Sequence, residues 1–354
     1  MRVDIIGGGI IGAATAFFLA KEGLSVRVLE RDASYQQSSF NRSCGGCRHQ
    51  FSTKENVLMS KYSIEFIKQV PDVGFVGNGY LMLFDHSMKD DFELSTQLQQ
   101  ENGATTKVLT PQQLKNMFSW INVDDVYRAC YTNDGSEGWF DPFSLHTWYK
   151  TEAKRNGAEF VEADGICRLH ESTNKADVVV IAAGCWSGNV GKQYGIDIPV
   201  KGHKHTVYTV KCPTHLPDMP LVADLITGAY WRPEGDGYIV GFAGNSEWDA
   251  VDLEANWNQW EETWTAMAHR AKMFEALRAT SAWAGYYDTC LIDNNAIIDH
   301  VDNVYFATGF TGRGLMHSPA VGLTLMEMIT KQSTTFDIDQ YRLNRQPSIE
   351  KYVI

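Results

Sequence analysis

The chain begins with the sequence Val3-Asp4-Ile5-Ile6-Gly7-Gly8-Gly9-Ile10-Ile11-Gly12-Ala13-Ala14-Thr15-Ala16-Phe17-Phe18-Leu19-Ala20. An apolar run, a glycine cluster and a long stretch of small and apolar residues predict a strand, a tight turn and a helix. A second apolar run, 25–29, follows and ends at Glu30. The order strand, glycine turn, helix, strand predicts a βαβ unit with two parallel strands.

The spacing of Gly7, Gly9 and Gly12 within this unit predicts a dinucleotide site. Gly7 permits the turn, Gly9 lets the backbone approach a pyrophosphate, and Gly12 lets the helix pack closely on the strand. The pyrophosphate is expected at the helix N-terminus, where unpaired N–H groups favour negative charge. Glu30 can accept hydrogen bonds from an adenosine ribose and would repel a 2′-phosphate. The motif therefore favours FAD or NAD over NADP, and by itself leaves FAD and NAD open.

Length and charge limit the class of protein. The chain has 354 residues, 44% of them hydrophobic, and a formal net charge of −12. This length suffices for two domains. The acidic charge disfavours binding to nucleic acid or to anionic membranes. No apolar run reaches about 18 residues, so no membrane span is predicted. The first strand starts at residue 3 and leaves no room for a signal peptide, so we expect a cytoplasmic protein.

The seven cysteines are odd in number and mostly scattered, as is typical of reduced thiols. The stretch Cys44-Gly45-Gly46-Cys47 has the spacing of a redox dithiol or of half a zinc site. No second pair of this kind completes a tetrahedral set, and the two glycines suit a close approach of backbone to a ligand. We therefore predict no metal site.

The rest of the chain alternates between two kinds of segment. Residues 177–183 are almost all apolar, as in a buried parallel strand. Residues 199–244 suggest antiparallel strands, with a hairpin from Ala229 to Gly241. Because the two kinds interleave along the chain, we expect an α/β fold with two interleaved domains.

Two helices are expected in the second half of the chain. Residues 252–277 suggest one long helix, whose tryptophans Trp257, Trp260 and Trp264 would pack against the core. A final helix is expected over 319–330, with Ser318 as its N-cap and Pro319 at its first position.

Six blocks, in order, resemble the D-amino-acid oxidase, glycine oxidase and sarcosine oxidase superfamily of FAD-dependent amine oxidoreductases. They are Gly7–Gly12 with Glu30, Asn41–Arg48, Asp134-Gly135 with Phe140-Asp141-Pro142, Ala176–Ser187, Tyr230–Gly235 and Ala307–Gly322. The resemblance covers nearly the whole chain and implies FAD rather than NAD. Some relatives tether the flavin through a cysteine in the stretch that corresponds to 282–288. This chain has no cysteine there, so non-covalent FAD is implied.

The resemblance also implies an arrangement of domains. A Rossmann-like FAD-binding domain would be formed by residues 1–74, 126–196 and 285–354. An interleaved substrate-binding domain with an antiparallel sheet would be formed by residues 75–125 and 197–284.

By resemblance, several segments of the chain would contact the flavin. The candidate cofactor contacts are Gly7, Gly9, Ile10, Ile11, Gly12, Glu30, Arg31, Arg42, Ser43, Gly45, Gly46, Ile166, Ala183, Gly184, Trp186, Gly309, Gly312, Arg313, Gly314, Leu315 and Met316. Backbone donors from Gly312 to Leu315 and the following helix would stabilise negative charge on the reduced flavin. Arg313 would either add positive charge there or be a solvated side chain.

The implied reaction is the oxidation of an amine or amino acid, such as an N-substituted glycine, glycine or a proline-like compound. Hydride would pass from the carbon beside the nitrogen to flavin N5, and the resulting imine would hydrolyse. A substrate carboxylate needs a cation, preferably an arginine, and each arginine could instead serve a structural ion pair. The candidate catalytic residues are Arg48 and Arg232 for the carboxylate, His49 and His317 for substrate protonation, and Tyr286, or its neighbour Tyr287, for a hydroxyl.

Departures from the family pattern leave the substrate and acceptor open. Sarcosine oxidases carry a lysine, linked to oxygen activation, in the strand that matches 238–241, and this chain has none there. The acceptor is therefore O2 or another molecule. Phe51 and Met316 stand where sarcosine oxidases have a cationic clamp. Two alternative functions remain: oxidation of a glycine-like group on a nucleobase or other large scaffold, against which the acidic charge argues, and an electron-carrying flavin subunit of a heteromeric dehydrogenase.

Overall fold

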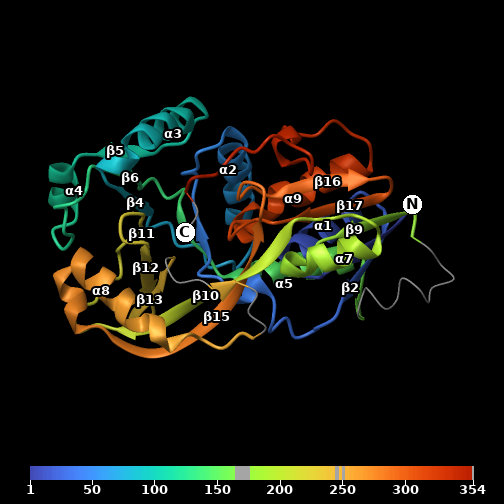
Figure 1. Cartoon of the computed structure of the whole chain (residues 1–354). Helices are drawn as coiled ribbons and strands as arrows, with labels where there is room; N and C mark the ends of the chain where they lie inside the picture. Colours follow the sequence, from blue (N-terminus) through green and yellow to red (C-terminus); the bar gives the residue numbers. More distant parts are fainter. Residues whose placement is uncertain (164–175, 244–246, 249–251, 353–354) are drawn as a thin grey trace.

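A computed structural model describes residues 1–163, 176–243, 247–248 and 252–352 of the chain, so the predicted contact Ile166 lies outside the described residues. Two large sheets lie next to each other, one covered by a layer of helices and the other forming the second half of the molecule (Figure 1). This mixed α/β architecture confirms the predicted fold class. In the described part of the chain, no helix has the length and apolar character that a bilayer crossing requires.

The six-stranded sheet has the strand order β16-β17-β9-β1-β2-β8. Its strands are β1 (Arg2–Ile6), β2 (Ser25–Glu30), β8 (Glu159–Glu162), β9 (Val178–Ile181), β16 (Ile297–Val301) and β17 (Val304–Thr308). Val3 of β1 lies opposite Val26 of β2 and Val178 of β9, and both pairings are parallel. Only β16 runs antiparallel to its neighbour β17. The predicted βαβ unit is thus confirmed, and the glycine turn lies at the carboxyl end of β1, in the middle of the sheet.

The helices over this sheet are α1 (Ile10–Lys21), α2 (Lys54–Lys68), α5 (Pro142–Arg155) and α9 (Gly314–Ile329). Helix α1 packs between α5 and α9, and α9 packs in turn against α2. Every residue of α1 except Lys21 is buried, which explains why its sequence is apolar on all sides. This helix layer holds the turn after β1 in place.

The nine-stranded sheet has the order β14-β10-β13-β12-β11-β4-β6-β5, and β15 also pairs with β10. Its strands are β4 (Tyr80–Phe84), β5 (Lys107–Leu109), β6 (Arg128–Thr132), β10 (Val200–Lys211), β11 (Leu221–Asp224), β12 (Ala229–Glu234), β13 (Gly237–Phe242), β14 (Glu247–Trp248) and β15 (Arg278–Cys290). The predicted hairpin is confirmed as β12 and β13. The long strands β10 and β15 extend to the six-stranded sheet, where β10 contacts α7 (Ser187–Gln193) (Figure 1). This sheet therefore lies over the carboxyl ends of the parallel strands.

Strand β6 corrects one predicted boundary. Residues 126–196 were expected in the FAD-binding part, but 128–132 pair along their full length with β4 and also with β5. Ala129 and Tyr131 belong to the core of the nine-stranded sheet. The strand is thus drawn into that sheet by long-range pairing. The remaining elements are α3 (Lys89–Glu101), α4 (Pro111–Met117) and the two-stranded pair β3 (Gly46–Cys47) with β7 (Gly138–Trp139).

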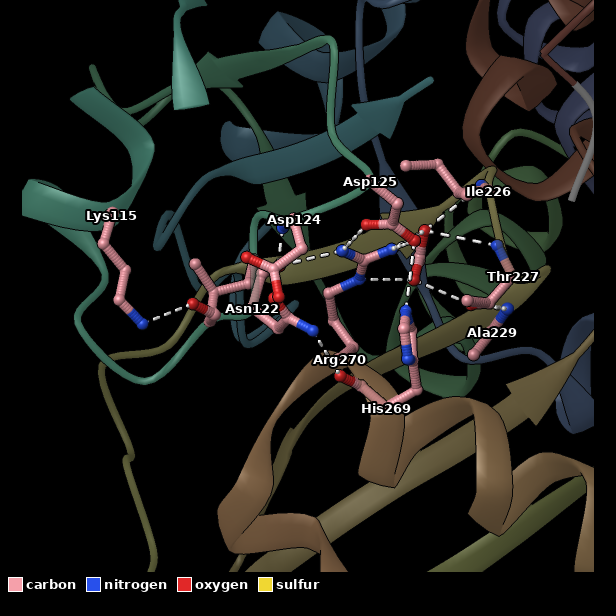
Figure 2. A network of polar contacts seen from close by, with 11 residues as sticks. Lys115, Asn122, Asp124, Asp125, Ile226, Thr227, Ala229, His269 and Arg270 are labelled. Atoms are coloured by element: carbon pink, nitrogen blue, oxygen red, sulfur yellow. Dashed lines mark hydrogen bonds and ion pairs between the residues drawn. The ribbon is translucent and has the colours of Figure 1, made fainter. Parts of the chain in front are cut away.

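Arg270, the last residue of α8 (Trp260–Arg270), ties this helix to the nine-stranded sheet (Figure 2). Its Nε donates to Asp224 at the end of β11 over 2.7 Å, and its Nη1 donates to Asp125 over 2.7 Å and to the Asn122 carbonyl over 2.8 Å. The side chains of Arg270 and Asp224 are fully buried. Asp224 also accepts bonds from the turn at Thr227. This buried ion pair fixes three segments relative to one another.

The expected helix over 252–277 is wrong at both ends. Helix α8 covers only 260–270, because Asn256 is extended and Ala271 leaves the helix at φ −145° and ψ 118°. Short 3-10 turns, 257–259 and 272–276, flank it. Trp260 and Trp264 pack against the core as predicted, whereas Trp257 is largely exposed.

The expected start of the last helix is also wrong. Helix α9 begins at Gly314, so Pro319 lies inside it and Ser318 is not an N-cap. Proline has no N–H for the carbonyl four residues earlier, Leu315 O. The Ser318 hydroxyl donates to that carbonyl over 2.9 Å. The Ser63 hydroxyl accepts from Ala320 N over 3.2 Å. These two serines compensate for the proline, and the helix starts five residues earlier than its sequence signal.

Candidate functional site

One pocket extends from the end of β2, past the glycine turn, to the nine-stranded sheet. We call the lining residues of β4, β10, β11, β12 and β15 the roof of this pocket. Most of the predicted cofactor contacts line it: Gly7, Gly9, Ile10, Ile11, Glu30, Arg31, Arg42, Ser43, Gly46, Ala183, Gly184, Trp186, Gly312, Arg313, Gly314, Leu315 and Met316. Gly12, Gly45 and Gly309 are not on its surface. Segments predicted to meet at one cofactor thus come together in one pocket.

The glycine turn leaves no room for side chains where the backbone must pack. Gly7 has φ +99°, and a Cβ there would lie 2.4 Å from Ala182 O. A Cβ on Gly12 would lie 1.9 Å from Gly7 O, so Gly12 acts behind the pocket by letting α1 approach β1. A Cβ on Gly9, in contrast, would meet nothing within 4 Å. Gly9 therefore leaves open space in front of the uncapped N-terminus of α1, as a pyrophosphate requires.

Glu30 shapes the same turn. Its two carboxylate oxygens accept hydrogen bonds from Gly8 N over 2.7 Å and from Asp32 N over 2.9 Å. A carboxylate has about four acceptor positions, so Glu30 retains capacity for ribose hydroxyls. His146 of α5, which no sequence motif marks, also holds this turn: its buried Nε2 donates to Gly8 O over 2.8 Å, and its ring stacks on Phe40.

A second helix N-terminus faces the opposite end of the pocket. Gly314, Leu315 and Met316, the first turn of α9, line the wall, and no side chain caps this turn. Arg313 lies just before it, 4% exposed, and donates to Asn294 O over 2.5 Å. Its Nη1 has no hydrogen-bond partner among the described residues. Arg313 is therefore a buried cation rather than a solvated one, and burial lowers the pKa of its guanidinium.

These features fit FAD. The uncapped amides of α1 suit the pyrophosphate, Glu30 suits the ribose, and the first turn of α9 with Arg313 suits an electron-rich ring. The residues that would hold FAD come from both ends of the chain and from the loop 37–48.

Arg48 occupies the pocket wall below the roof. Its side chain is 5% exposed, and its two terminal nitrogens donate to Gln50 O and Tyr352 O. The guanidinium carbon lies 4.0 Å from the centre of the Phe51 ring. Among the described ion pairs, none joins Arg48 to a carboxylate. Arg48 is thus a fixed, buried cation that faces the pocket and makes no ion pair among the described residues, and its charge acts on the buried carboxyl of Glu137.

Arg232 does not reach the pocket lining. It pairs with Glu234, and its Nε donates to Cys44 O over 2.8 Å. The guanidinium therefore fixes the loop at Cys44 instead of meeting a ligand, in line with the structural alternative.

The two predicted histidines are buried behind the lining. His317 Nε2 lies 2.8 Å from Ser60 Oγ, and burial, with the charges of Arg313 and Arg48, lowers its pKa well below the ordinary value. His49 Nδ1 lies 3.5 Å from Glu137, and burial lowers its pKa to about 4. Both are neutral near pH 7.

Of the two tyrosines, Tyr286 lines the pocket near Trp186, and its hydroxyl donates to Asp252 O over 2.6 Å. Tyr287 lines the roof, and burial raises the pKa of its phenol. Tyr287 therefore belongs to the roof, where its ring lies 4.1 Å from that of His205.

Several roof residues escaped the sequence analysis. They are Tyr80, His205, Val207, Leu221 and Tyr230. The available signal was strand alternation: His205 and Val207 lie on the same face of β10, and Val207 lies opposite Gly241 of β13, which lies opposite Tyr230 of β12. No motif marks this face, because its residues come from four strands.

The two close cysteines are free thiols. Cys44 lines the pocket, and burial raises its pKa to about 11. Cys47 is fully buried in β3, and burial raises its pKa as well. Protonated thiols are poor nucleophiles and poor metal ligands. Across the described parts of the chain, no group of three or more His, Cys, Asp or Glu side chains is arranged to hold a metal ion.

Comparison with known proteins agrees with this geometry. Residues 2–328 match the family described as FAD dependent oxidoreductase (DAO). FAD-dependent oxidoreductase domain-containing protein 1 of Xenopus laevis is 33% identical over 99% of this chain and 84% of its own length. L-proline dehydrogenase from P. horikoshii superposes with a TM-score of 0.85 at 28% identity, over 97% of this chain and 96% of its own. Glycine oxidase from Geobacillus kaustophilus superposes with a TM-score of 0.82 at 21% identity, over 98% and 100%. The chain belongs to the DAO family of FAD-dependent oxidoreductases.

Proposed function

We propose that this protein oxidises a small α-amino acid, of the N-substituted glycine, glycine or proline type, at the carbon next to its nitrogen. The observation that carries the proposal is Arg48: a buried guanidinium that faces the pocket and has no carboxylate within ion-pair distance among the described residues. Burying a cation that makes no direct ion pair is costly, and a substrate carboxylate would reduce that cost.

Around Arg48, this chain's residues bind and orient. The carbonyls of Gln50 and Tyr352 and the face of Phe51 fix the guanidinium plane, as bidentate binding of a carboxylate requires. Tyr80, Tyr230 and Tyr287 are buried, and burial raises the pKa of each. Their protonated phenols surround the reacting carbon with apolar rings and exclude water.

Bound FAD would accept a hydride from the substrate carbon. Arg313 and the first turn of α9 would offer positive potential where the electrons arrive. Loss of hydride from an amine bound as the free base gives the iminium directly, so this step would need no side-chain base. His49 and His317, buried and neutral, place no positive charge against it.

The test is an anaerobic titration of the FAD-loaded protein with pairs of amines that differ only in the carboxylate: sarcosine against dimethylamine, and L-proline against pyrrolidine. We expect the amino acid of at least one pair to bleach the visible flavin band and its partner to leave it. Equal reduction by both members of every pair, or none by any, would overturn the proposal.

We further propose that the electrons pass to an acceptor other than O2. Support comes from β13, which has no lysine at the position linked to oxygen activation in sarcosine oxidases, and from the similarity to an L-proline dehydrogenase. Reduced protein mixed with air-saturated buffer should reoxidise slowly and with little hydrogen peroxide. Rapid stoichiometric peroxide formation would contradict this.

A further inference from the structure

His205 lies on the roof of the pocket and has no assigned role in the proposed reaction. It comes from β10 and lines the same pocket as Arg48. The side chain is buried, with the residue 8% exposed. Both ring nitrogens lack a hydrogen-bond partner among the described residues. Buried polar atoms in native proteins almost always have a partner, so an imidazole with two vacant positions in a ligand pocket points to a bound group.

The His205 ring is held by its neighbours rather than by hydrogen bonds. Its centroid lies 4.1 Å from that of Tyr287 and 4.5 Å from that of His203. His203 in turn stacks on Trp248 with centroids 4.0 Å apart. Packing from two sides fixes the orientation of the imidazole, as a binding residue requires.

The ring is also uncharged. Burial, with a smaller contribution from His203, lowers its pKa to about 3. A neutral imidazole has one N–H donor and one acceptor nitrogen. Because the two ring nitrogens point in divergent directions, one ligand group meets only one of them. A hydroxyl or a carboxamide can pair with either nitrogen, since each both donates and accepts.

Arg48 and His205 line the same pocket but come from different parts of the chain, the loop before α2 and strand β10. The ring of Tyr287, on the neighbouring strand β15, also lines this pocket and lies 4.1 Å from the ring of His205. A ligand whose carboxylate binds Arg48 can therefore present a second polar group to His205.

We propose that His205 is a specificity-determining residue that binds a hydroxyl or carboxamide on the side chain or N-substituent of the amino-acid substrate. The proposal relies on the proposed function in one respect: the substrate carboxylate must bind Arg48. It narrows the substrate class to amino acids that carry a second, uncharged polar group.

The test uses two probes that cannot be oxidised, because an ether oxygen replaces the amine nitrogen. (2-Hydroxyethoxy)acetate and propoxyacetate have the same length and differ only by a hydroxyl in place of a methyl group. Their dissociation constants from the FAD-loaded protein are measured by perturbation of the flavin spectrum. We expect the hydroxyl probe to bind at least about tenfold more tightly, since a site built to hydrogen-bond a hydroxyl rejects the analogue that lacks it.

Three variants complete the test. His205→Leu should bring the ratio of the two constants to about one, and His205→Gln, which keeps a donor and an acceptor, should retain most of the preference. His86→Leu is the matched control: this histidine is exposed and lies outside the pocket lining, so its replacement should leave the ratio unchanged.

A ratio of one in the wild type, no binding of either probe, or an unchanged ratio in His205→Leu would each overturn the inference. A change in FAD affinity alone in His205→Leu would assign the residue to the flavin instead and would also overturn it. Because binding of the probes requires no turnover, it tests the role of His205 whether or not the protein oxidises amines. The anaerobic titrations test amine oxidation separately.

Discussion

At the scale of single residues, Glu30 has two tasks. It accepts hydrogen bonds from Gly8 N and Asp32 N and so shapes the turn, and it keeps acceptor capacity for the ribose. Both tasks depend on the carboxylate, and neither involves the reacting end of the pocket.

We predict that Glu30→Ala lowers FAD affinity about 10- to 150-fold, because one charged hydrogen bond contributes roughly 1.5–3 kcal/mol. The fraction that still holds FAD should be reduced by substrate at nearly the wild-type rate. FAD affinity is measured by titrating the apoprotein, with the exposed Glu22→Ala as the control. A fully loaded variant with a large drop in reduction rate would contradict the assignment.

Arg48 and Arg232 show how far single residues can be interpreted from sequence. Both were candidates for the carboxylate, and sequence could not separate them. Their difference is tertiary: Arg48 is held by Tyr352 O from the far end of the chain, whereas Arg232 is neutralised by Glu234 two residues away. For His205 the only signal was the alternation of β10, which does not show that strands β12 and β15 join it at one pocket.

At the scale of elements, the buried pair Arg270–Asp224 holds α8 against the nine-stranded sheet. Burial tends to raise the pKa of Asp125, but the hydrogen bonds and charge of Arg270 outweigh this and lower it. Arg270 therefore stabilises the ionised form of Asp125.

We predict that Arg270→Met lowers the free energy of unfolding by about 3–5 kcal/mol, because Asp224 would remain buried without its counter-charge. Urea unfolding of the FAD-loaded protein measures this. In the control, Arg342→Met breaks the half-exposed pair with Asp299 and should cost about 1 kcal/mol or less. Equally small decreases in the free energy of unfolding of both variants would show that the ion pair of Arg270 stabilises the fold no more than that of Arg342.

Elements were predictable where the signal is local. The glycine turn, the strands beside it and the hairpin of β12 and β13 follow from turn chemistry and periodicity. The start of α9 could not be predicted in this way, because the hydroxyls of Ser318 and Ser63 compensate for Pro319 inside the helix. The ends of α8 could not be predicted either: Trp257 falls in a 3-10 turn that the Asn256 side chain caps, and the backbone leaves the helix at Ala271.

At the scale of the whole molecule, the two interleaved sheets were expected but the place of β6 was not. Its partners β4 and β5 precede it in sequence, and only their pairing shows to which sheet it belongs.

Buried histidines make the stability of the whole molecule depend on pH. Burial lowers the pKa of His49 and of His146 to about 4.

We predict that stability falls as pH drops from about 6.5 to about 4. Over this range the unfolded chain binds protons at histidines that stay neutral in the folded protein, so acid favours unfolding. Urea midpoints of the FAD-loaded protein at several pH values measure this. His146→Gln, which keeps a donor for Gly8 O but does not titrate, should show a weaker pH dependence. The same dependence in wild type and variant would contradict this prediction.

The central claim is that Arg48 binds the carboxylate of an amino acid that reduces the flavin. Its most direct test is stopped-flow anaerobic reduction of wild type and Arg48→Lys by L-proline and by pyrrolidine. Lysine keeps the charge but loses the planar fork. We expect Arg48→Lys to hold normal FAD and to lose roughly 2–4 kcal/mol in kcat/KM for proline, about 30- to 900-fold, with little change for pyrrolidine. Reduction by proline as fast as in the wild type, at low substrate and full FAD content, would contradict the account.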